Sequence, residues 1–207
     1  MAVKADTQED PLHRITIAAR RLFAEQGVAA TRLEDVAREA AMSRQYLYRF
    51  VSGRDEVIEM VLTARCQEIG AALEERAHHK AGDELEPALV DHIVAGIQMG
   101  HDPEFSYLAE ALDRTRLTRF LVSAHSPLHA INRRAFGPFL ARAVAADILR
   151  TDVSVDAMVV WLQDVMTMLT GRDDLDEQAL RVTVRDFILP SLLVPAPGRR
   201  SSRRGDA

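Results

Sequence analysis

Apolar residues recur at intervals of three and four along most of the chain, which is the spacing of an amphipathic α-helix. In the N-terminal part this spacing predicts a first helix that ends at Gly27, where a residue with positive φ would close it. A short second helix is predicted after Thr31, and a third over residues 43–49. Alternation with a period of two is almost absent, so the pattern predicts an all-α protein.

Capping residues mark where these N-terminal helices begin. Thr31 and Glu34 have the spacing of a capping box, in which a hydroxyl and a carboxylate satisfy each other's backbone N–H groups. Ser52 and Asp55 repeat that spacing at the start of a fourth helix, and Ser43 is placed to cap the third. Two short capped helices separated by three residues are the outline of a helix-turn-helix.

Beyond the fourth helix the chain continues as a series of helical segments. They are predicted over 84–100, 103–112, 115–124, 127–149, 155–170 and 176–193. We therefore expect a helix-turn-helix head over 11–54 and a larger helical body over 55–194, joined by a linking helix over 55–79. Residues 1–10 are expected to be a flexible N-terminus, and the arginine-rich tail 195–207 is too polar to fold and is also expected to be flexible.

Composition limits the cellular location and the kinds of partner that we expect. The chain has 207 residues, 47% of them hydrophobic, but neither a signal peptide nor an apolar run long enough to cross a bilayer, so a cytoplasmic protein without membrane contact is expected. Its net charge of -5 argues against indiscriminate coating of nucleic acid, yet residues 40–54 hold three arginines and no acid. The single cysteine, Cys66, is interpreted as structural.

The third predicted helix carries the residue types that read base edges. In a helix-turn-helix the second helix enters the major groove, where arginine pairs with guanine and glutamine with adenine. Arg44 and Gln45 fit that role, while Tyr46 offers a hydroxyl or a ring. The alternative is that the tyrosines are half-buried packing residues and the arginines are merely solvated. The candidate DNA contacts are Thr31, Arg32, Ser43, Arg44, Gln45, Tyr46, Tyr48, Arg49 and Arg54.

The stretch TRLEDVAREAAMSRQYLYRFVSGRDEV, residues 31–57, resembles the DNA-binding segment of the tetracycline repressor (TetR) family. The match is ungapped, with Val-Ala, Met-Ser and Leu-Tyr pairs at the family's intervals. Three positions depart from the family pattern: Ala41 stands for the usual turn glycine, Val51 for phenylalanine and Arg54 for lysine. A non-glycine residue in a left-handed turn is strained by roughly 1 kcal/mol.

The resemblance implies a ligand-responsive transcriptional regulator, a repressor that binds a palindromic double-stranded DNA operator as a homodimer and is released by a small apolar or amphipathic effector. It also implies a ligand pocket on the central helices, although each residue there could equally be ordinary core. The candidate pocket residues are Phe105, Tyr107, Leu108, Leu112, Phe120, Leu121, His125, Leu128, Asn132, Phe136, Phe139 and Gln163.

The last two predicted helices hold more apolar surface than one face needs, and such an excess either packs inside the monomer or marks an oligomer interface. We favour the interface, because the resemblance implies a four-helix bundle with a second subunit. The candidate interface residues are Val155, Met158, Val159, Leu162, Val165, Met166, Leu180, Val184, Phe187 and Ile188.

Two other function classes are weighed against a regulator. A metal-dependent helical-bundle enzyme needs two Glu-x-x-His pairs, and the chain has one, Glu75 with His78; His125 and His129 lack an obvious carboxylate helper. Neither a metal nor a cofactor is therefore expected, and no enzyme activity. A helical protein-interaction module without DNA binding would have no reason to keep Arg44, Gln45 and Arg49 exposed.

Overall fold

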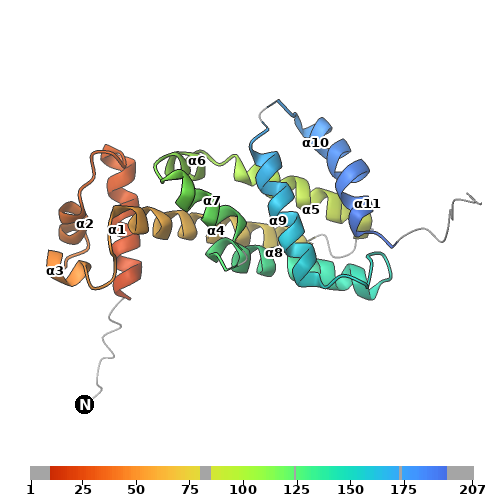
Figure 1. Ribbon diagram of the computed structural model, residues 1–207, viewed down its shortest axis with the longest axis horizontal. Helices are drawn as coiled ribbons and strands as arrows, with labels where there is room; N and C mark the ends of the chain where they lie inside the picture. The colour runs from red at the N-terminus through yellow and green to blue at the C-terminus, as the bar shows by residue number, and fades with distance from the viewer. Residues whose placement is uncertain (1–9, 80–84, 124, 173, 195–207) are drawn as a thin grey trace, which may run out of the picture. The chain divides into compact units, whose positions relative to one another are not determined.

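The computed structural model describes residues 10–79, 85–123, 125–172 and 174–194, with the backbone alone for residues 77–79. Figure 1 shows helices α1 (Pro11–Gln26), α2 (Leu33–Glu39), α3 (Arg44–Leu47), α4 (Arg54–His79), α5 (Leu85–Gly100), α6 (Pro103–Glu110), α7 (Arg114–Val122), α8 (Pro127–Ala145), α9 (Val155–Thr170), α10 (Glu177–Thr183) and α11 (Leu189–Leu192). Between α10 and α11 lies the π-helical turn η1 (Val184–Ile188). Across these ranges an isolated bridge between Leu149 and Leu193 is the one extended pairing. The all-α prediction is confirmed.

The chain forms two compact units. The first contains Met1–Ile69 and Gly100–Ile131, and the second contains Gly70–Met99 and Asn132–Ala207. The expected boundary at residue 54 thus falls inside the first unit, since α6 and α7 share a core with the head helices. Of the expected flexible ends, residues 1–9 and 195–207 lie outside the described residues, whereas Asp10 is ordered as a helix cap.

Helix α1 begins and ends where local chemistry dictates. The Asp10 carboxylate accepts from the Leu12 N–H at 3.1 Å, and Pro11 occupies the first turn, where its missing N–H costs nothing. Four residues at helical spacing, Ile15, Ala18, Ala19 and Phe23, are buried. The helix ends at Gly27, whose φ of 86° is one that glycine adopts without strain, as predicted.

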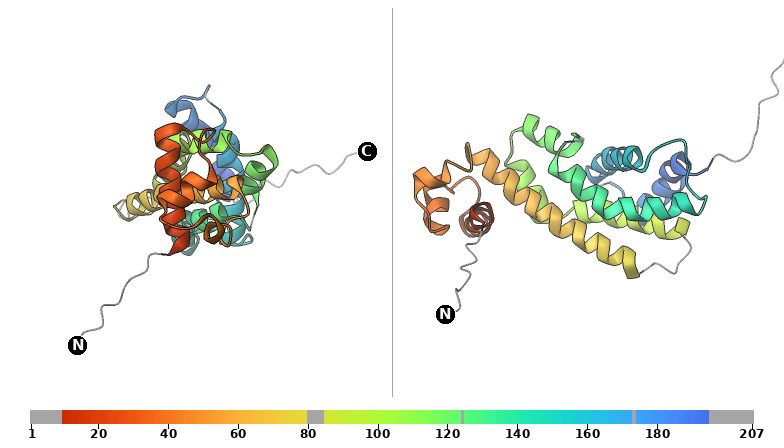
Figure 2. Two further views of the ribbon diagram at one scale, coloured as in Figure 1. Left: turned by 90° about the vertical axis from the view of Figure 1, so that its left-hand side faces the viewer. Right: turned by 90° about the horizontal axis from the view of Figure 1, so that it is seen from below.

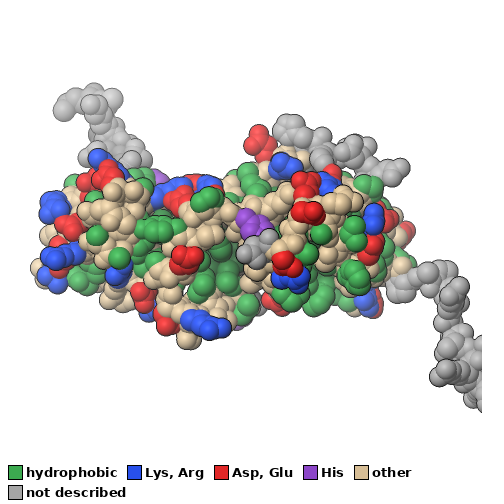
Figure 3. Space-filling view, turned by 90° about the horizontal axis from the view of Figure 1, so that it is seen from above, with side chains coloured by type: hydrophobic (Ala, Val, Ile, Leu, Met, Phe, Trp, Pro, Cys, Tyr) green, Lys and Arg blue, Asp and Glu red, His purple; other side chains and the backbone are tan. Residues whose placement is uncertain are grey.

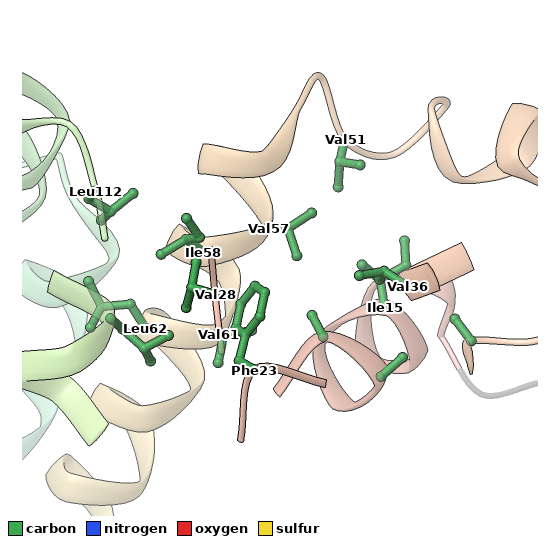
Figure 4. Packing of buried hydrophobic residues seen from close by; sticks show 14 of the residues in the cluster. Ile15, Phe23, Val28, Val36, Val51, Val57, Ile58, Val61, Leu62 and Leu112 are labelled. Carbon is green, nitrogen blue, oxygen red and sulfur yellow. The ribbon is translucent and has the colours of Figure 1, made fainter. Parts of the chain in front are cut away.

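A single apolar core holds α1, α2 and α3 against α4. Figures 1 and 2 show α2 and α3 lying beside α1, and Figure 4 shows Ile15 and Phe23 of α1 together with residues of α2 and α4 in that core. Val36 and Leu47 are 1% and 0% exposed, which fixes the inward faces of α2 and α3. Leu108, Leu112 and Phe120 of the α6–α7 region join the same cluster.

The turn between α2 and α3 has the strained geometry that the sequence predicts. Ala41 has a φ of 52°, one of the two positive values at non-glycine residues in the described part of the chain. The Met42 N–H returns to the Ala37 carbonyl at 2.9 Å, which closes the turn. Arg14 of α1 donates to the carbonyls of both Ala40 and Ala41. A side chain from another helix therefore braces the strained peptide.

In the second unit α5 is buried along most of its length. Gly96 lies where α8 and α9 approach α5: a Cβ there would lie 2.7 Å from Met166 Cε and 3.1 Å from Phe136 Cζ. His92 is also buried, and its Nε2 lies 3.0 Å from the Ala135 carbonyl oxygen. Burial lowers the pKa of His92, so the ring is neutral near pH 7 and packs as an aromatic residue.

The last predicted helix is continuous but not uniform. Within it the Leu189 N–H bonds to the carbonyl of Val184, five residues back, which makes the turn at Val184–Ile188 π-helical. Pro190 follows directly, and because proline has no backbone N–H it cannot donate to the carbonyl four residues back, as an α-helical residue would. The wider turn accommodates the proline and presents Phe187 outward, with 76% of its surface exposed.

Candidate nucleic-acid interface

Helix α3 is four residues long and is held at both ends. The Ser43 hydroxyl oxygen accepts from the Tyr46 N–H at 3.1 Å, so the predicted cap is confirmed. Leu47 is the buried anchor of the helix at 0% exposure. Because these contacts fix the helix on the core, they also fix the direction of its outward side chains.

The outward face of α3 and the residues after it is polar, cationic and aromatic. Arg44, Gln45, Tyr48 and Arg49 are exposed, and Tyr46 is half-buried with its ring edge-on to Phe50 at 5.0 Å. The packing alternative therefore holds for Tyr46, while its neighbours face outward. The five residues together form what we call the α3 surface: Arg44, Gln45, Tyr46, Tyr48 and Arg49.

Cation–π contacts organise the two arginines of the α3 surface. The Arg44 guanidinium lies over the Tyr48 ring at 5.5 Å, and that of Arg49 lies over the Tyr46 ring at 5.8 Å. Arg44 also pairs with Glu34 of α2, with Nη1 and Oε1 2.9 Å apart. The Tyr48 side chain and then the charge of Glu34 raise the pKa of Arg44, which keeps the guanidinium cationic.

The predicted capping box at α2 is wrong. Thr31 is buried, and its hydroxyl donates to the Gly27 carbonyl at 2.8 Å and accepts from the Gln26 amide at 3.3 Å. The cap residue of α2 is Arg32, which makes no side-chain capping bond. Thr31 is therefore a structural residue of the loop before α2 and is withdrawn from the DNA contacts. Arg32 remains exposed at the start of α2.

Only the carboxylate half of the second predicted capping box is present among the described residues, and a different acid provides it. Glu56, rather than Asp55, accepts from both the backbone N–H and the hydroxyl of Ser52, at 2.6 and 2.7 Å. The bonds from Ser52 lower the pKa of Glu56. Asp55 instead faces Arg116 of α7 at 3.5 Å. The N-terminus of α4 is thus joined to α7 as well as to its own preceding turn.

Arg54 has a structural partner that the sequence did not indicate. Its guanidinium donates to the Val28 carbonyl at 2.6 Å, in the loop between α1 and α2. The backbone N–H of Val28 donates to the Tyr107 hydroxyl of α6 at 2.5 Å. The backbone of Val28 is therefore hydrogen-bonded to side chains of two helices, and Arg54 helps to hold the loop between α1 and α2 in place.

An ionic cluster joins α1, α4 and α6 in the first unit. Arg20 of α1 pairs with Glu104 of α6 at 2.7 Å and with Glu68 of α4, and Arg65 of α4 pairs with Asp102 at 2.5 Å. Hydrogen bonds from Arg65 and Arg20 respectively lower the pKa values of Asp102 and Glu68. Figure 3 shows such alternation of acidic and basic side chains on the surface. We call these five residues the α1–α4–α6 cluster.

The candidate pocket residues are divided between the two units. Leu108, Leu112 and Phe120 are buried in the core of the first unit, and Tyr107, bound to Val28, lines an open groove of about 880 Å³ with Ile17, Phe23 and Val61. Phe105, Leu121 and Leu128 pack on the same core, while His125 is exposed.

In the second unit Phe136 and Phe139 are buried against His92, and Asn132 donates to Gln163 at 3.3 Å. Gln163 is 4% exposed, so this amide pair is a polar contact within an apolar core. His92 is a buried polar residue that the sequence reasoning missed. Its position on the strongly apolar predicted helix at 84–100 was the available signal.

The expected dimer surface requires correction. Eight of the candidate residues are buried within the chain itself and so expose little or no surface to a partner: Met158, Val159, Leu162, Val165, Met166, Leu180, Val184 and Ile188. Val155 is half-buried, and Phe187 is exposed. The large exposed apolar residues on these helices are Trp161 at 47%, Met168 at 65% and Phe187 at 76%.

Two kinds of site are absent among the same described residues. No group of three or more histidine, cysteine, aspartate or glutamate side chains there is placed to hold a metal ion. None of the helices in those ranges has the length and apolarity needed to span a bilayer. The Cys66 thiol is buried, which raises its pKa to about 12 and suits a structural side chain. The histidine of the single Glu-x-x-His pair lies outside the side chains described.

Comparison with known proteins places this geometry in context. Residues 15–61 match the family model of bacterial regulatory proteins of the tetR family. An HTH-type transcriptional repressor of Mycobacterium tuberculosis is 29% identical over 160 residues, spanning 70% of this chain and 83% of the relative. An uncharacterized HTH-type transcriptional regulator of the same species is 24% identical over 191 residues, spanning 88% and 85%.

Two solved structures share the fold. The TetR family repressor AlkX from Dietzia sp. strain DQ12-45-1b, implicated in biodegradation of n-alkanes, has a TM-score of 0.60 at 16% identity and covers 88% of this chain and 95% of its own. RolR in complex with the ligand resorcinol has a TM-score of 0.59 at 15% identity and covers 88% and 87%. The likeness extends over both compact units.

Proposed function

The chain belongs to the tetR family of bacterial regulatory proteins and is a DNA-binding transcriptional regulator, and from that premise we propose that it represses transcription by binding a palindromic DNA operator as a homodimer. A small apolar or amphipathic effector releases it. The observation that carries the proposal is the capped helix α3, whose anchor Leu47 is buried while Arg44 and Gln45 point outward.

The direction of regulation rests on the relative. The mycobacterial protein that is 29% identical is named as a repressor, and it spans most of both chains. A protein bound across a promoter competes with transcription, which is the simplest outcome of operator binding by a two-domain regulator. We therefore assign repression rather than activation to this chain.

The α3 surface supports a division between sequence readout and anchoring. Residues early in a recognition helix face base edges, and those at its end face the phosphate backbone. Arg44 and Gln45 are the proposed base readers, and Tyr48 and Arg49 the proposed backbone contacts, with Arg32 and Ser43 at helix starts that face phosphate. Arg54 is a proposed phosphate contact only through the part of its side chain that the Val28 carbonyl leaves free.

Dimerisation is proposed through the exposed apolar residues of the last helices. Trp161 and Met168 lie seven residues apart on α9 and so share one face, and Phe187 is the most exposed of the large apolar residues in the described chain. Exposed aromatic and methionine side chains are typical of interface cores. A dimer also supplies the second recognition helix that a short α3 needs for affinity.

An effector is proposed because a protein of this fold, RolR, is described with resorcinol bound. The proposed effector contacts are the candidate side chains that belong to the first unit, among them Tyr107 and Leu108, which line its open groove. Helix α6 is the proposed transmitter, because its Tyr107 and Glu104 contact the loop after α1 and Arg20. A shift of α6 would therefore change the support of the helix-turn-helix.

The decisive experiment is selection of bound duplexes from a random DNA pool by the full chain. A repressor of this kind enriches a palindrome with half-sites about one helical turn, roughly 34 Å, apart, and its affinity falls steeply as salt rises. A protein-interaction module enriches no sequence and shows no steep salt dependence. The selected duplex then serves to screen apolar and amphipathic compounds, resorcinol among the first, for operator release.

Compounds from that screen also test the coupling. A true effector raises the melting temperature of the protein and lowers its affinity for the selected duplex in the same concentration range. Stabilising compounds that leave operator affinity unchanged would show that a pocket exists but is not coupled to DNA binding.

A further inference from the structure

Glu34 and Arg44 form an ion pair on the exposed surfaces of α2 and α3. The Arg44 Nη1 and Glu34 Oε1 atoms lie 2.9 Å apart, and the two side chains are 62% and 45% exposed. Ion pairs this exposed add little to folding stability, because solvent screens them and ordering the long side chains costs entropy. The pair therefore affects what Arg44 can bind more than how stable the fold is.

The guanidinium of Arg44 is held from two directions. The Glu34 carboxylate is its ion-pair partner at Nη1, and the Tyr48 ring lies 5.5 Å from the guanidinium carbon. An arginine that reads guanine must present two N–H groups in one plane to O6 and N7. Fixing the guanidinium before DNA arrives reduces the rotamer freedom that this contact would otherwise lose.

The carboxylate of Glu34 also opposes binding without sequence recognition. Arginines bind phosphate on any DNA, so a free Arg44 would add to affinity for every sequence. With Glu34 paired to it, Arg44 can reach a phosphate only by giving up that partner and by bringing a negative charge toward the backbone. A guanine edge uses the remaining N–H groups and leaves the pair intact.

The other carboxylates of α2 do not share this arrangement. Asp35 pairs with Arg38 of the same helix at 2.5 Å, and Glu39 pairs with Arg21 of α1 at 2.8 Å. Neither forms an ion pair with an arginine of the α3 surface in the described structure. Glu34 is thus the acid of α2 whose removal changes a proposed base reader directly.

We propose that Glu34 is a specificity-determining residue, which positions Arg44 for a base edge and withholds it from phosphates. The proposal rests on the proposed operator binding and adds a residue to it. It does not follow from a helix-turn-helix outline, because the sequence pattern assigned Glu34 to a capping box that the structure does not contain.

The test compares Glu34→Gln with the matched control Asp35→Asn. Asp35 is the next residue along α2 and pairs with Arg38 instead of Arg44, so the control removes one negative charge without changing the partner of Arg44. Affinities of the full chain are measured for the selected operator and for a scrambled duplex of equal composition, over a series of salt concentrations. Both variants are repeated in an Arg44→Ala background. Thermal unfolding of every variant is recorded, and the exposed pair predicts unchanged melting temperatures.

For Glu34→Gln we expect binding to the scrambled duplex to strengthen about five- to tenfold at 0.1 M salt, with a salt slope steeper by about one. Operator affinity should not strengthen, so the operator-to-scrambled ratio falls about five- to tenfold. Asp35→Asn should leave that ratio unchanged, and Glu34→Gln should leave it unchanged once Arg44 is absent.

Each result decides between the two claims. If the wild-type chain discriminates the operator and Glu34→Gln discriminates it equally well, the role of Glu34 is wrong while operator binding stands. A fall in the ratio that persists in the Arg44→Ala background also overturns the proposal, because the effect then does not pass through Arg44. If the wild-type chain fails to discriminate, the proposed function and this inference are both overturned.

Discussion

The hydroxyl of Tyr107 accepts a hydrogen bond from the backbone N–H of Val28 at 2.5 Å, 79 residues away in sequence. Val28 follows Gly27, the residue that ends α1, and Tyr107 belongs to α6. A Cβ on Gly27 would lie 3.3 Å from the same hydroxyl, so glycine permits this approach as well as the φ of 86°. One helix outside the sequence-predicted head thus holds the loop that leads into α2.

Replacing Tyr107 by phenylalanine removes the acceptor and leaves the ring. The Val28 N–H then turns to water or stays unpaired, and the free energy of unfolding should fall by about 1 kcal/mol. Urea unfolding of both proteins measures this difference. Operator affinity should fall further than stability alone requires, because the loop after α1 loses its tie to α6. A phenylalanine variant with wild-type affinity would show that this tie does not support DNA binding.

The turn at Ala41 gives a second prediction, on stability alone. Ala41→Gly relieves a left-handed alanine that costs about 1–2 kcal/mol, against roughly 0.5–1 kcal/mol of added chain entropy. The free energy of unfolding should therefore rise by about 0.5 kcal/mol. Chemical denaturation of the variant and the wild type checks this sign.

Arg14 is expected to hold that turn from α1. Arg14→Met removes its two bonds to the carbonyls of Ala40 and Ala41 and should lower the free energy of unfolding by about 1–2 kcal/mol. Arg21→Met is the matched control on the same helix, since Arg21 is 64% exposed and makes surface ion pairs only. Equal effects of the two substitutions in urea would contradict a bracing role for Arg14.

Local signals were readable from the sequence, and contacts between distant segments were not. Ser43 and Ala41 were predicted correctly because a cap and a turn depend on residues three or four positions away. Thr31 and Glu34 carried the same cap spacing, yet the loop before α2 is set by Arg54 and Tyr107, which bind Val28 from other helices. The sequence pattern holds no trace of those partners.

Most of the interface residues chosen from the sequence were wrong for a related reason. Apolar periodicity shows that a face is buried but not whether the same chain or another covers it. Leu162 and Phe187 looked alike in the pattern, and they are 1% and 76% exposed. Phe187 lies within the π-helical turn Val184–Ile188, whose wider spacing departs from a periodicity of 3.6 residues, so the pattern does not show which way its side chain points.

The α1–α4–α6 cluster predicts a pH dependence of stability. Arg65 lowers the pKa of Asp102 in the folded protein. The ionised carboxylate therefore contributes its full stabilisation of the fold above the pKa of an aspartate in the unfolded chain, about 4. That contribution is lost as the pH falls through the lower folded value. Asp102→Asn keeps the oxygen that caps α6 but removes the charge, so stability should fall at neutral pH and depend less on pH below about 4.

Asp113→Asn is the control for that measurement, because Asp113 caps α7 through the Thr115 N–H and has no arginine partner in the described structure. Urea unfolding is followed from neutral pH into the acid range for both variants. If the two variants show the same acid profile, the ion pair with Arg65 does not set the acid sensitivity of Asp102.

The oligomeric state tests the corrected dimer surface. Phe187→Glu places a charge on a side chain that is 76% exposed, so the fold of the single chain should survive with little change in melting temperature. In the proposed dimer the same charge is buried against a partner without a counter-ion, which strongly opposes association. Light scattering at micromolar concentration should then report a dimer for the wild type and a monomer for the variant.

Two further variants separate dissociation from unfolding. Leu162→Glu buries a charge inside the chain, since Leu162 is 1% exposed, and should unfold the protein. Val122→Glu alters an apolar residue of α7 that is 48% exposed and lies outside the proposed interface, and it should leave the dimer intact. Because one α3 binds too little DNA surface, Phe187→Glu should also lose most operator affinity while circular dichroism still reports a folded helical chain. A folded dimer in that variant, with operator affinity unchanged, would place the interface elsewhere than around Phe187.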